Sequence, residues 1–294
     1  MLHFEVTWVY MKRKTFVILL ATLLIAPLAL YSWLFDIPNR AYINVIFNQN
    51  LMSTSLPCYE AKNPKFLDVN NRINLAVWNI YKQNRDDWQP FLSDLASDKQ
   101  LVLLQEVALD DGFINWLADG SSFAAQANAF SVNGRVAGVL NLSQSQPKKV
   151  CAMRASEPWI LLPKSALYSL FPLSNGQELA LVNIHSINFS IGVEEYLGQI
   201  KELAQKLSQH SGPIIFAGDF NTWNDSRMRV LNDVMEDLEL SEAIFEQDQR
   251  TRFINGFVLD HIFFRGLNMI DSKTIPTTAS DHNPLVVSFD LPSE

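Results

Sequence analysis

Cysteine is scarce in this sequence of 294 residues, which contains only Cys58 and Cys151. Two thiols cannot build the disulfide framework of a small secreted domain, and they cannot form a metal site made of thiolates. A single disulfide between them would suit a compartment outside the cytoplasm, and two unpaired thiols are the alternative.

Basic residues are also in the minority, because 23 Lys and Arg stand against 31 Asp and Glu, giving a formal net charge of -8. This balance argues against the broad basic surface that binds duplex DNA. It does not exclude a nucleic-acid substrate, since a metal ion and a few local arginines can supply positive charge. With 48% hydrophobic residues, the chain is expected to be globular with a sizeable core.

Long hydrophobic runs are absent except for one, which extends from Thr15 to Phe35 and follows Lys12, Arg13 and Lys14. The run is long enough to cross a bilayer as a helix. Its basic flank predicts a cytoplasmic N-terminus, with the rest of the chain outside the cytoplasm. We therefore expect residues 1–35 to be a membrane anchor.

Two alternatives to an extracytoplasmic, anchored protein stay open. A cleaved signal peptide would also be apolar, although this run is long for one and no small-x-small cleavage site follows it. A cytoplasmic location would follow if the run did not insert. The first ten residues resemble neither a targeting segment nor a folded element, so Met1 and Met11 both fit as the start.

The remaining chain has no internal repeat and no low-complexity tract. Residues 36–71 are polar and contain several prolines, which predicts a spacer that packs only in part on a domain formed by residues 72–294. Apolar segments in that domain predict strands over Ile73–Ile80, Leu101–Val107, Ala180–His185, Pro213–Gly218, Val258–Phe264 and Pro284–Phe289. Helices are expected over Glu194–Gln209 and after Asp225, which would cap the second one. This order predicts an α/β or α+β fold with strands buried on both faces.

The segment PIIFAGDFNTWND, residues 213–225, places an acid and an amide after a predicted strand. Because side chains alternate along an extended backbone, Asp219 and Asn221 should point the same way while Phe220 points into the core. A simple turn between strand and helix would use the same residue types.

Polar residues interrupt or end the other predicted strands in a similar way. They are Asn79, Glu106, His185, Asp260, Asp281 and His282. Each one alone has an ordinary explanation, such as a turn, an edge or a cap. Their repetition favours a functional site, because ionisable groups at buried strand ends are costly unless they pair or bind a metal.

These motifs, WNI, LLQE, NIHS, GDFN, LDHIF and SDHNPL, resemble in order those of the endonuclease/exonuclease/phosphatase superfamily of metal-dependent phosphoesterases. The resemblance extends from Arg72 to Pro292, and the sequences of these motifs are most similar to those of the bacterial YafD family. It implies a four-layer sandwich of two packed β-sheets flanked by helices, preceded here by one N-terminal membrane helix.

The resemblance also implies a metal site. A phosphate ester is anionic and repels a nucleophile, so its hydrolysis needs a hard divalent cation held by carboxylate and amide oxygens. Mg²⁺, or Mn²⁺ in its place, is the implied cofactor. Glu106 would be the main ligand, Asn79 would support it, and Asp281 would assist through water.

Four catalytic roles follow from the same resemblance. Asp219 would take the proton of the attacking water, and Asn221 would orient that water or the phosphate. His282, held by Asp260, would stabilise the charge on the phosphoryl oxygens.

His185 would lie on the other side of the phosphate, as a hydrogen-bond donor or as a general acid to the leaving group. DNase I-like proteins give the equivalent histidine an acidic partner, whereas the nearby segment VAGVLNLSQS offers only Asn141 and Ser143, so both roles stay open. Asn188 is a weaker candidate for a phosphate contact.

The expected function is hydrolysis of phosphate esters by a phosphodiesterase, nuclease or phosphatase. Nucleic acid, phospholipid headgroups and inositol phosphates are the candidate substrates. The membrane would be a partner through residues 15–35, and no obligate protein partner is implied. A membrane-tethered binding domain without turnover is the alternative, although the intact set of site residues favours an enzyme. A serine hydrolase has little support, because no serine lies in a strand-to-helix elbow.

Overall fold

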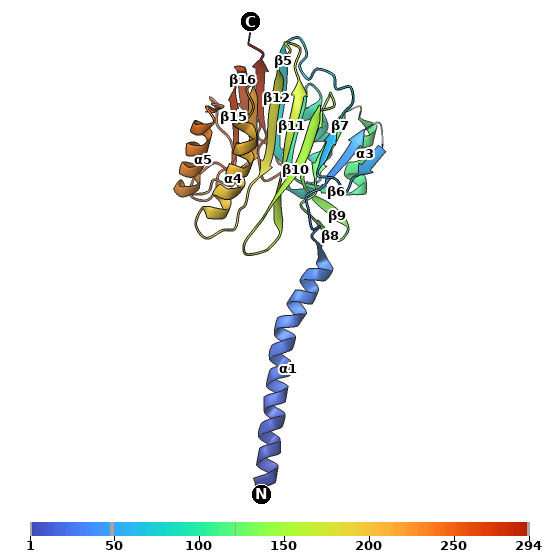
Figure 1. The fold of residues 1–294 in the computed structure, drawn as a ribbon, viewed down its shortest axis with the longest axis vertical. Coiled ribbons are helices and arrows are strands. Elements are labelled where there is room, and N and C mark those ends of the chain that lie inside the picture. The colour runs from blue at the N-terminus through green and yellow to red at the C-terminus, as the bar shows by residue number, and fades with distance from the viewer. Residues whose placement is uncertain (1, 48–49, 121, 293–294) are drawn as a thin grey trace.

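The computed structural model describes residues 2–47, 50–120 and 122–292; the side chains of residues 2–14, 18 and 20 lie outside this description. One long helix, α1 (Leu2–Leu34), leaves the folded domain at one end, and the C-terminus lies at the opposite end (Figure 1). The part Thr15–Leu34 is long and apolar enough to cross a membrane, as expected, and a signal sequence would pass the same test. The basic side chains at 12–14, on which the expected orientation depends, lie outside the description.

Two packed β-sheets form the domain, and helices cover their outer faces (Figure 1). Among the described residues, the first sheet has the order β16-β17-β5-β6-β9-β7-β2-β3, with β8 joining β9 and β1 joining β8. Its strands are β1 (Phe35–Asp36), β2 (Ile43–Phe47), β3 (Asn50–Ser53), β5 (Arg72–Asn79), β6 (Leu101–Leu109), β7 (Phe123–Ala127), β8 (Phe130–Val132), β9 (Arg135–Ser143), β16 (Asn268–Thr274) and β17 (Leu285–Asp290).

The second sheet has the order β14-β15-β13-β12-β11-β10-β4. Its strands are β4 (Cys58–Glu60), β10 (Lys149–Ser156), β11 (Pro163–Pro172), β12 (Glu178–His185), β13 (Ile214–Asp219), β14 (Ser241–Glu242) and β15 (Asp260–Arg265). The helices α2 (Trp88–Ala96) and α3 (Asp111–Asp119) pack on the first sheet, and α4 (Glu194–Leu207) and α5 (Asp225–Asp237) pack on the second. This is the expected four-layer sandwich.

Alternation along each central strand explains the layers. In β5, Leu75 and Val77 face the second sheet in the inner core, whereas Ala76 and Trp78 face the core under α2 and α3. The strand is buried on both faces, which is why its sequence reads as continuously apolar. The six expected strands and the helix at Glu194 are confirmed to within about two residues, the usual uncertainty of element ends.

Two expectations about local structure were wrong. The cap of α5 is Asn224, whose side chain accepts a hydrogen bond from the Arg227 backbone N–H, rather than Asp225, which is the first helical residue. Residues 36–71 are also more than a spacer, because β2 and β4 belong to the two sheets and Ile43 and Val45 are fully buried. The folded part therefore begins well before residue 72.

A disulfide joins Cys58 to Cys151, which face each other across the pairing of β4 with β10. The structure thus contains a disulfide rather than two unpaired thiols. It closes a loop between residues 93 positions apart, for which the chain-entropy argument gives about 4.6 kcal/mol of stabilisation.

One end of the sandwich collects the predicted polar residues. Arg72 of β5 pairs with Asp290 of β17 and Val77 pairs with Leu285, so Asn79 lies at the end of β5 away from the C-terminus. The C-terminus is opposite α1 (Figure 1). The strand end that carries Asn79 therefore faces the side from which α1 leaves.

Candidate active site

A cavity of about 210 Å³ opens at this end of the sheets. It is lined by all of the expected site residues except Asp260: Asn79, Glu106, His185, Asn188, Asp219, Asn221, Asp281 and His282. Asp260 lies directly behind His282. The fold thus brings together residues that are up to about two hundred positions apart in the sequence.

Asp219 ends β13, is buried and lines the cavity. Its Oδ1 accepts a hydrogen bond from the Asn221 backbone N–H at 2.9 Å, and its Oδ2 accepts one from Asn79 Nδ2 at 3.0 Å. Asn221 lines the same cavity and donates through Nδ2 to the Ser186 carbonyl at 3.1 Å. Phe220 is buried in the core under α4 and α5, as the alternation predicted.

The environment of Asp219 makes it a better base than an ordinary aspartate. Burial disfavours its charged form, and the neighbouring Asp260 carboxylate adds repulsion, so the pKa of Asp219 rises to about 6, with His282 and the Asn221 N–H opposing the shift. A carboxylate with a pKa nearer to neutral accepts a proton more readily at neutral pH.

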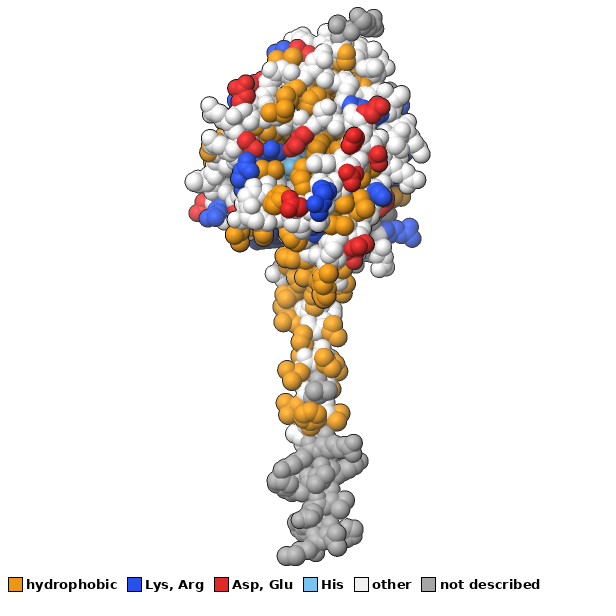
Figure 2. Space-filling view, turned by 90° about the vertical axis from the view of Figure 1, so that its left-hand side faces the viewer, with side chains coloured by type: hydrophobic (Ala, Val, Ile, Leu, Met, Phe, Trp, Pro, Cys, Tyr) orange, Lys and Arg blue, Asp and Glu red, His pale blue; other side chains and the backbone are white. Residues whose placement is uncertain are grey.

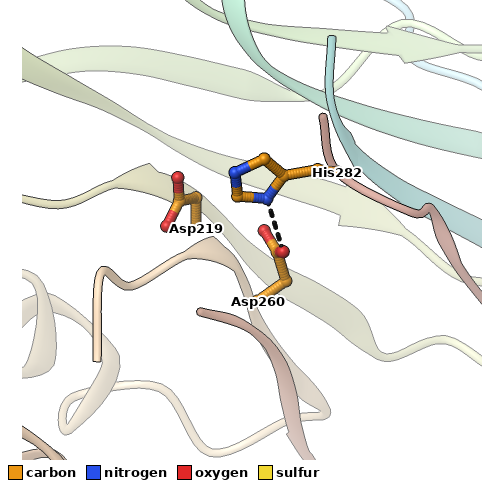
Figure 3. A group of neighbouring side chains, drawn as sticks. All are labelled: Asp219, Asp260 and His282. Carbon is orange, nitrogen blue, oxygen red and sulfur yellow. Dashed lines mark hydrogen bonds and ion pairs between the residues drawn. The ribbon is translucent and has the colours of Figure 1, made fainter. Parts of the chain in front are cut away.

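Asp260 and His282 form a buried pair. Antiparallel pairing of β13 with β15 sets Asp260 beside Asp219, and its Oδ2 accepts a hydrogen bond from His282 Nδ1 at 2.7 Å (Figure 3). Burial alone would lower the pKa of His282, but the Asp260 carboxylate outweighs it, and Asp219 and Asp281 add to the effect, so the pKa rises to about 10. His282 is therefore an imidazolium at neutral pH, with its second ring nitrogen on the side of Asp219 (Figure 3).

Asp219, Asp260 and His282 are also close enough to hold one metal ion, because one ligand atom from each lies within 4.8 Å of the others. Their chemistry favours a different use. Nδ1 of His282 already gives its proton to Asp260, and an imidazolium has no free lone pair for a metal. We interpret the group as an acid–base cluster rather than the main metal site.

Glu106 reaches the cavity through a β-bulge. The pairing of β6 with β9 shifts between Leu104 and Val107, and Glu106 has a φ of 55°, which non-glycine residues rarely adopt. The preceding Gln105 turns inward and donates to Asn183 Oδ1 at 2.7 Å between the two sheets. The bulge thus directs Glu106 toward the cavity while its neighbour joins the core.

The oxygen atoms around Glu106 fit a hard divalent cation. Its carboxylate pairs with the ammonium group of Lys82, a half-exposed side chain, so a positive charge already lies at this position. Among the described residues, Asn79 Oδ1 accepts only from the Tyr81 N–H, at 3.1 Å, and the exposed Asp281 lines the same cavity. Carboxylate and amide oxygens without sulfur are the donor set of Mg²⁺.

His185 ends β12 on another wall of the cavity. Its Nε2 lies 2.9 Å from Lys164 Nζ, 3.6 Å from Asp219 Oδ2 and 3.7 Å from Glu106 Oε1. Burial and the charges of Lys164 and Lys82 lower its pKa well below the usual value, so His185 is neutral here.

The two residues that the sequence offered as partners of His185 lie elsewhere. Asn141 belongs to a buried amide network between the sheets, where it contacts Asn183 and Ser169, and Ser143 bonds to the Ser145 carbonyl. The closest polar neighbour of His185 is instead the cation Lys164, on a strand that sequence reasoning did not predict.

Sequence reasoning missed several residues that shape the site. Lys82 follows Asn79 closely in WNIYKQ, so its position was a usable signal. Glu157 gave no such signal: it is fully buried and accepts backbone N–H bonds from Asn188 at 2.6 Å and Phe189 at 3.3 Å. It holds the loop that brings Asn188, whose half-buried side chain lines the cavity, to the site.

Comparison with known proteins identifies the family of this chain. Residues 76–282 match the sequence pattern of the Endonuclease/Exonuclease/phosphatase family. The chain belongs to this family. A UPF0294 protein of Vibrio parahaemolyticus is 46% identical over 278 residues, covering 95% of this chain and 99% of the relative.

Solved structures of the family share the fold at low sequence identity. The catalytic domain of human Nocturnin with bound sulfate aligns with a TM-score of 0.60 and 19% identity, covering 78% of this chain and 98% of that one. D. rerio TDP2 complexed with single strand DNA product aligns with a TM-score of 0.54 and 16% identity, covering 74% and 99%. Most members of the endonuclease/exonuclease/phosphatase family are metal-dependent hydrolases of phosphate esters.

Proposed function

We propose that this protein is a Mg²⁺-dependent phosphoesterase in which Asp219 activates the attacking water. The observation that carries the proposal is the cluster in Figure 3, where a buried carboxylate with a raised pKa lies beside an imidazolium held by a second carboxylate. An anion that must accept a proton and a cation that must stabilise charge then share one small cavity.

Asp219 takes the proton of a water molecule in the cavity. Its two oxygens are fixed by the Asn221 N–H and the Asn79 side chain, so the accepting lone pair has a set direction. Asn221 is anchored through Nδ2 to the Ser186 carbonyl, which leaves its side-chain oxygen to orient the water or the phosphate.

His282 and the cations of the site stabilise the anionic transition state. With Nδ1 bonded to Asp260, His282 donates its other ring proton to a phosphoryl oxygen. Beside His185, on another wall of the cavity, the Lys164 ammonium donates to Nε2 of the neutral imidazole at 2.9 Å and supplies positive charge on the leaving-group side. Asn188 contributes a side-chain amide from the same wall.

Glu106, Asn79 and Asp281 would hold Mg²⁺, or Mn²⁺ in its place. When bound, the cation neutralises the phosphate and polarises its P–O bonds. Two solved relatives agree with a phosphate-ester substrate, since Nocturnin was crystallised with sulfate and TDP2 with a single strand DNA product.

We also propose that α1 anchors the protein in a membrane with the domain outside the cytoplasm. The apolar length of Thr15–Leu34 supports insertion. The disulfide between Cys58 and Cys151 supports an oxidising compartment, because such bonds are rare in the cytoplasm.

The metal site is tested by Glu106→Gln, which removes one ligand charge at nearly constant shape. The Mg²⁺ concentration for half-maximal hydrolysis of bis-p-nitrophenyl phosphate should rise at least about tenfold. Glu178→Gln, at the other end of the strand that carries His185, is the matched control and should leave that concentration unchanged. Full turnover of the unmodified protein in excess EDTA would refute the metal requirement.

A further inference from the structure

A second cavity of about 250 Å³ adjoins the candidate active site. The two cavities share Lys82, Glu106, His185 and Asn188 in their walls. Apart from Glu157, Lys164 and Ser165, the rest of the lining of the second cavity is apolar. Its apolar lining includes Ala129, Phe130, Ala137, Ile160, Leu162 and Phe189.

This apolar cavity lies between the candidate active site and the root of α1. Phe35, directly after α1, lies with its ring 6.0 Å from that of Phe130, and β1 pairs with β8. The Tyr31 hydroxyl donates to the Ile160 carbonyl at 3.0 Å. The lining of the cavity is thus in direct contact with the end of the apolar helix.

Loops near the cavity expose large apolar side chains on the same side. Trp159 and Leu161, between β10 and β11, are 62% and 60% exposed, and Phe189 and Ile191, between β12 and α4, are 55% and 74% exposed. Both loops extend toward α1 (Figure 1). Hydrophobic side chains also continue from the lower edge of the domain onto the helix (Figure 2). Exposed aromatic and aliphatic residues beside a membrane helix are typical of a surface that meets the lipid interface.

We propose that the substrate is a phosphate ester of a membrane lipid, with its phosphate at Glu106 and His282 and its hydrocarbon chain in the apolar cavity. This inference rests on the proposed function and names its substrate class. A nucleotide or an inositol phosphate has no long apolar group and would leave this cavity filled with water, whereas a lipid buries apolar surface there. The orientation also fits, because the site opens on the side of α1 and a lipid can reach it without leaving the membrane surface.

The reaction on such a substrate is a simple hydrolysis. Water oxygen forms a bond to phosphorus while one P–O ester bond breaks. One proton of the water goes to Asp219, and the leaving alkoxide takes up a proton to become an alcohol. No oxidant or reductant is needed.

The test is a series of p-nitrophenyl alkyl phosphodiesters with ethyl, butyl and octyl groups, assayed with Mg²⁺ and the full chain in detergent micelles. Each buried methylene improves binding about fourfold at most, so kcat/KM should be at least about thirtyfold higher for the octyl than for the ethyl ester. Leu162→Asp makes the cavity polar and Ala137→Phe fills it, and either change should reduce the octyl-to-ethyl ratio below about threefold. Ile270→Asp, an exposed apolar position on the distant edge strand β16, should keep the ratio of the unmodified protein, which controls for partition into micelles.

The outcomes separate this inference from the proposed function. Equal kcat/KM for all three esters overturns the lipid substrate while the phosphoesterase stands. Faster hydrolysis of a single-stranded oligonucleotide than of the octyl ester would also overturn the lipid substrate and leave the phosphoesterase standing. If no ester is hydrolysed, the proposed function falls as well. If folded Leu162→Asp and Ala137→Phe proteins keep the octyl preference, the octyl group binds outside the apolar cavity and the proposal is contradicted. If neither variant folds, the ester series on the unmodified protein decides.

Discussion

His282 keeps its proton because one carboxylate outweighs the cost of burial. The hydrogen bond and charge of Asp260 raise the pKa of His282 to about 10, far above the usual value for histidine. A raised pKa of this kind stabilises the fold fully below about pH 6.5 and ceases to do so as the pH rises through about 10. The pair therefore contributes both charge and stability at neutral pH.

Replacing Asp260 with Asn should reverse the shift. Burial would still disfavour the charged form, and only the charges of Asp219 and Asp281 would oppose it, so the pKa of His282 should fall from about 10 toward its ordinary value. Titration of ¹³C-labelled histidine by NMR in EDTA measures this without any substrate. Asp248→Asn, whose carboxylate pairs with Arg250 instead, is the control and should leave His282 protonated. A His282 resonance that titrates near pH 10 in Asp260→Asn would mean that another group holds the proton.

Single residues also show what sequence reasoning can reach. Asp219 and Asn221 both line the cavity, but Asn221 lies beyond β13 with a φ of 48°, so the turn after the strand, rather than strand alternation, brings it there. The neighbour of His185 was not found, since Lys164 comes from an unpredicted strand and approaches only through the sheet pairing. Glu106 stood out because it interrupts an apolar strand, but its role as a metal ligand came from the resemblance, because the bulge that turns it into the cavity leaves no mark in the sequence LLQEV.

The junction of β13 with the site depends on one glycine. Gly218 has a φ of 140°, and a Cβ atom added there would lie 2.0 Å from the Ile184 carbonyl oxygen of the parallel strand β12. Only glycine allows the two strands to approach this closely just before Asp219 and His185. Gly218 thus sets the distance between the strand ends that carry His185 and Asp219.

Gly218→Ala should destabilise the protein by about 2–5 kcal/mol, because the backbone must shift and the strained φ remains. The same substitution at Gly198 is the matched control, since that glycine is exposed within α4 with no atom near the added methyl group. Gly198→Ala should stabilise by about 0.5–1 kcal/mol. The thermal unfolding midpoints of both variants measure these changes in stability. An unchanged midpoint in Gly218→Ala would show that the strands tolerate the methyl group.

Elements with long apolar runs were predictable and the others were not. The strands β5, β6, β12, β13, β15 and β17 lie in the sheet interiors, where both faces are buried. In contrast, β10 alternates buried and half-exposed residues, and β2 and β4 are short strands in a proline-containing segment. Their pairing partners define them, and pairing over long sequence distances cannot be read from one local window.

At the scale of the molecule, α1 leaves the domain at one end (Figure 1). The strand ends that carry the site lie at that end, and the apolar cavity adjoins the root of α1 through Phe130 and Ile160. With α1 as the proposed membrane anchor, its orientation decides which side of the membrane the site faces. The basic residues before Thr15 predict that the domain lies outside the cytoplasm, and the disulfide agrees with that compartment.

This orientation predicts that a phosphatase reporter fused after Glu294 is active, because such reporters fold only outside the cytoplasm. A β-galactosidase reporter at the same position should be inactive. Exchanging Lys12, Arg13 and Lys14 for Gln should weaken the difference, since these charges hold the N-terminus inside. The reverse pattern on a well-expressed fusion would place the domain in the cytoplasm.

The central claim, that Asp219, Asp260 and His282 act as one catalytic cluster, is tested most directly by His282→Ala. With the soluble substrate bis-p-nitrophenyl phosphate, kcat should fall at least about 100-fold with little change in KM, because the lost charge acts mainly in the transition state. Asp260→Asn should lose less, and the double variant should be little worse than His282→Ala, since the two residues act as a unit. Thermal midpoints recorded alongside exclude unfolding as the cause. A folded His282→Ala protein that keeps the unmodified kcat, on a substrate whose hydrolysis still requires Asp219, would contradict the account and leave His282 a structural residue.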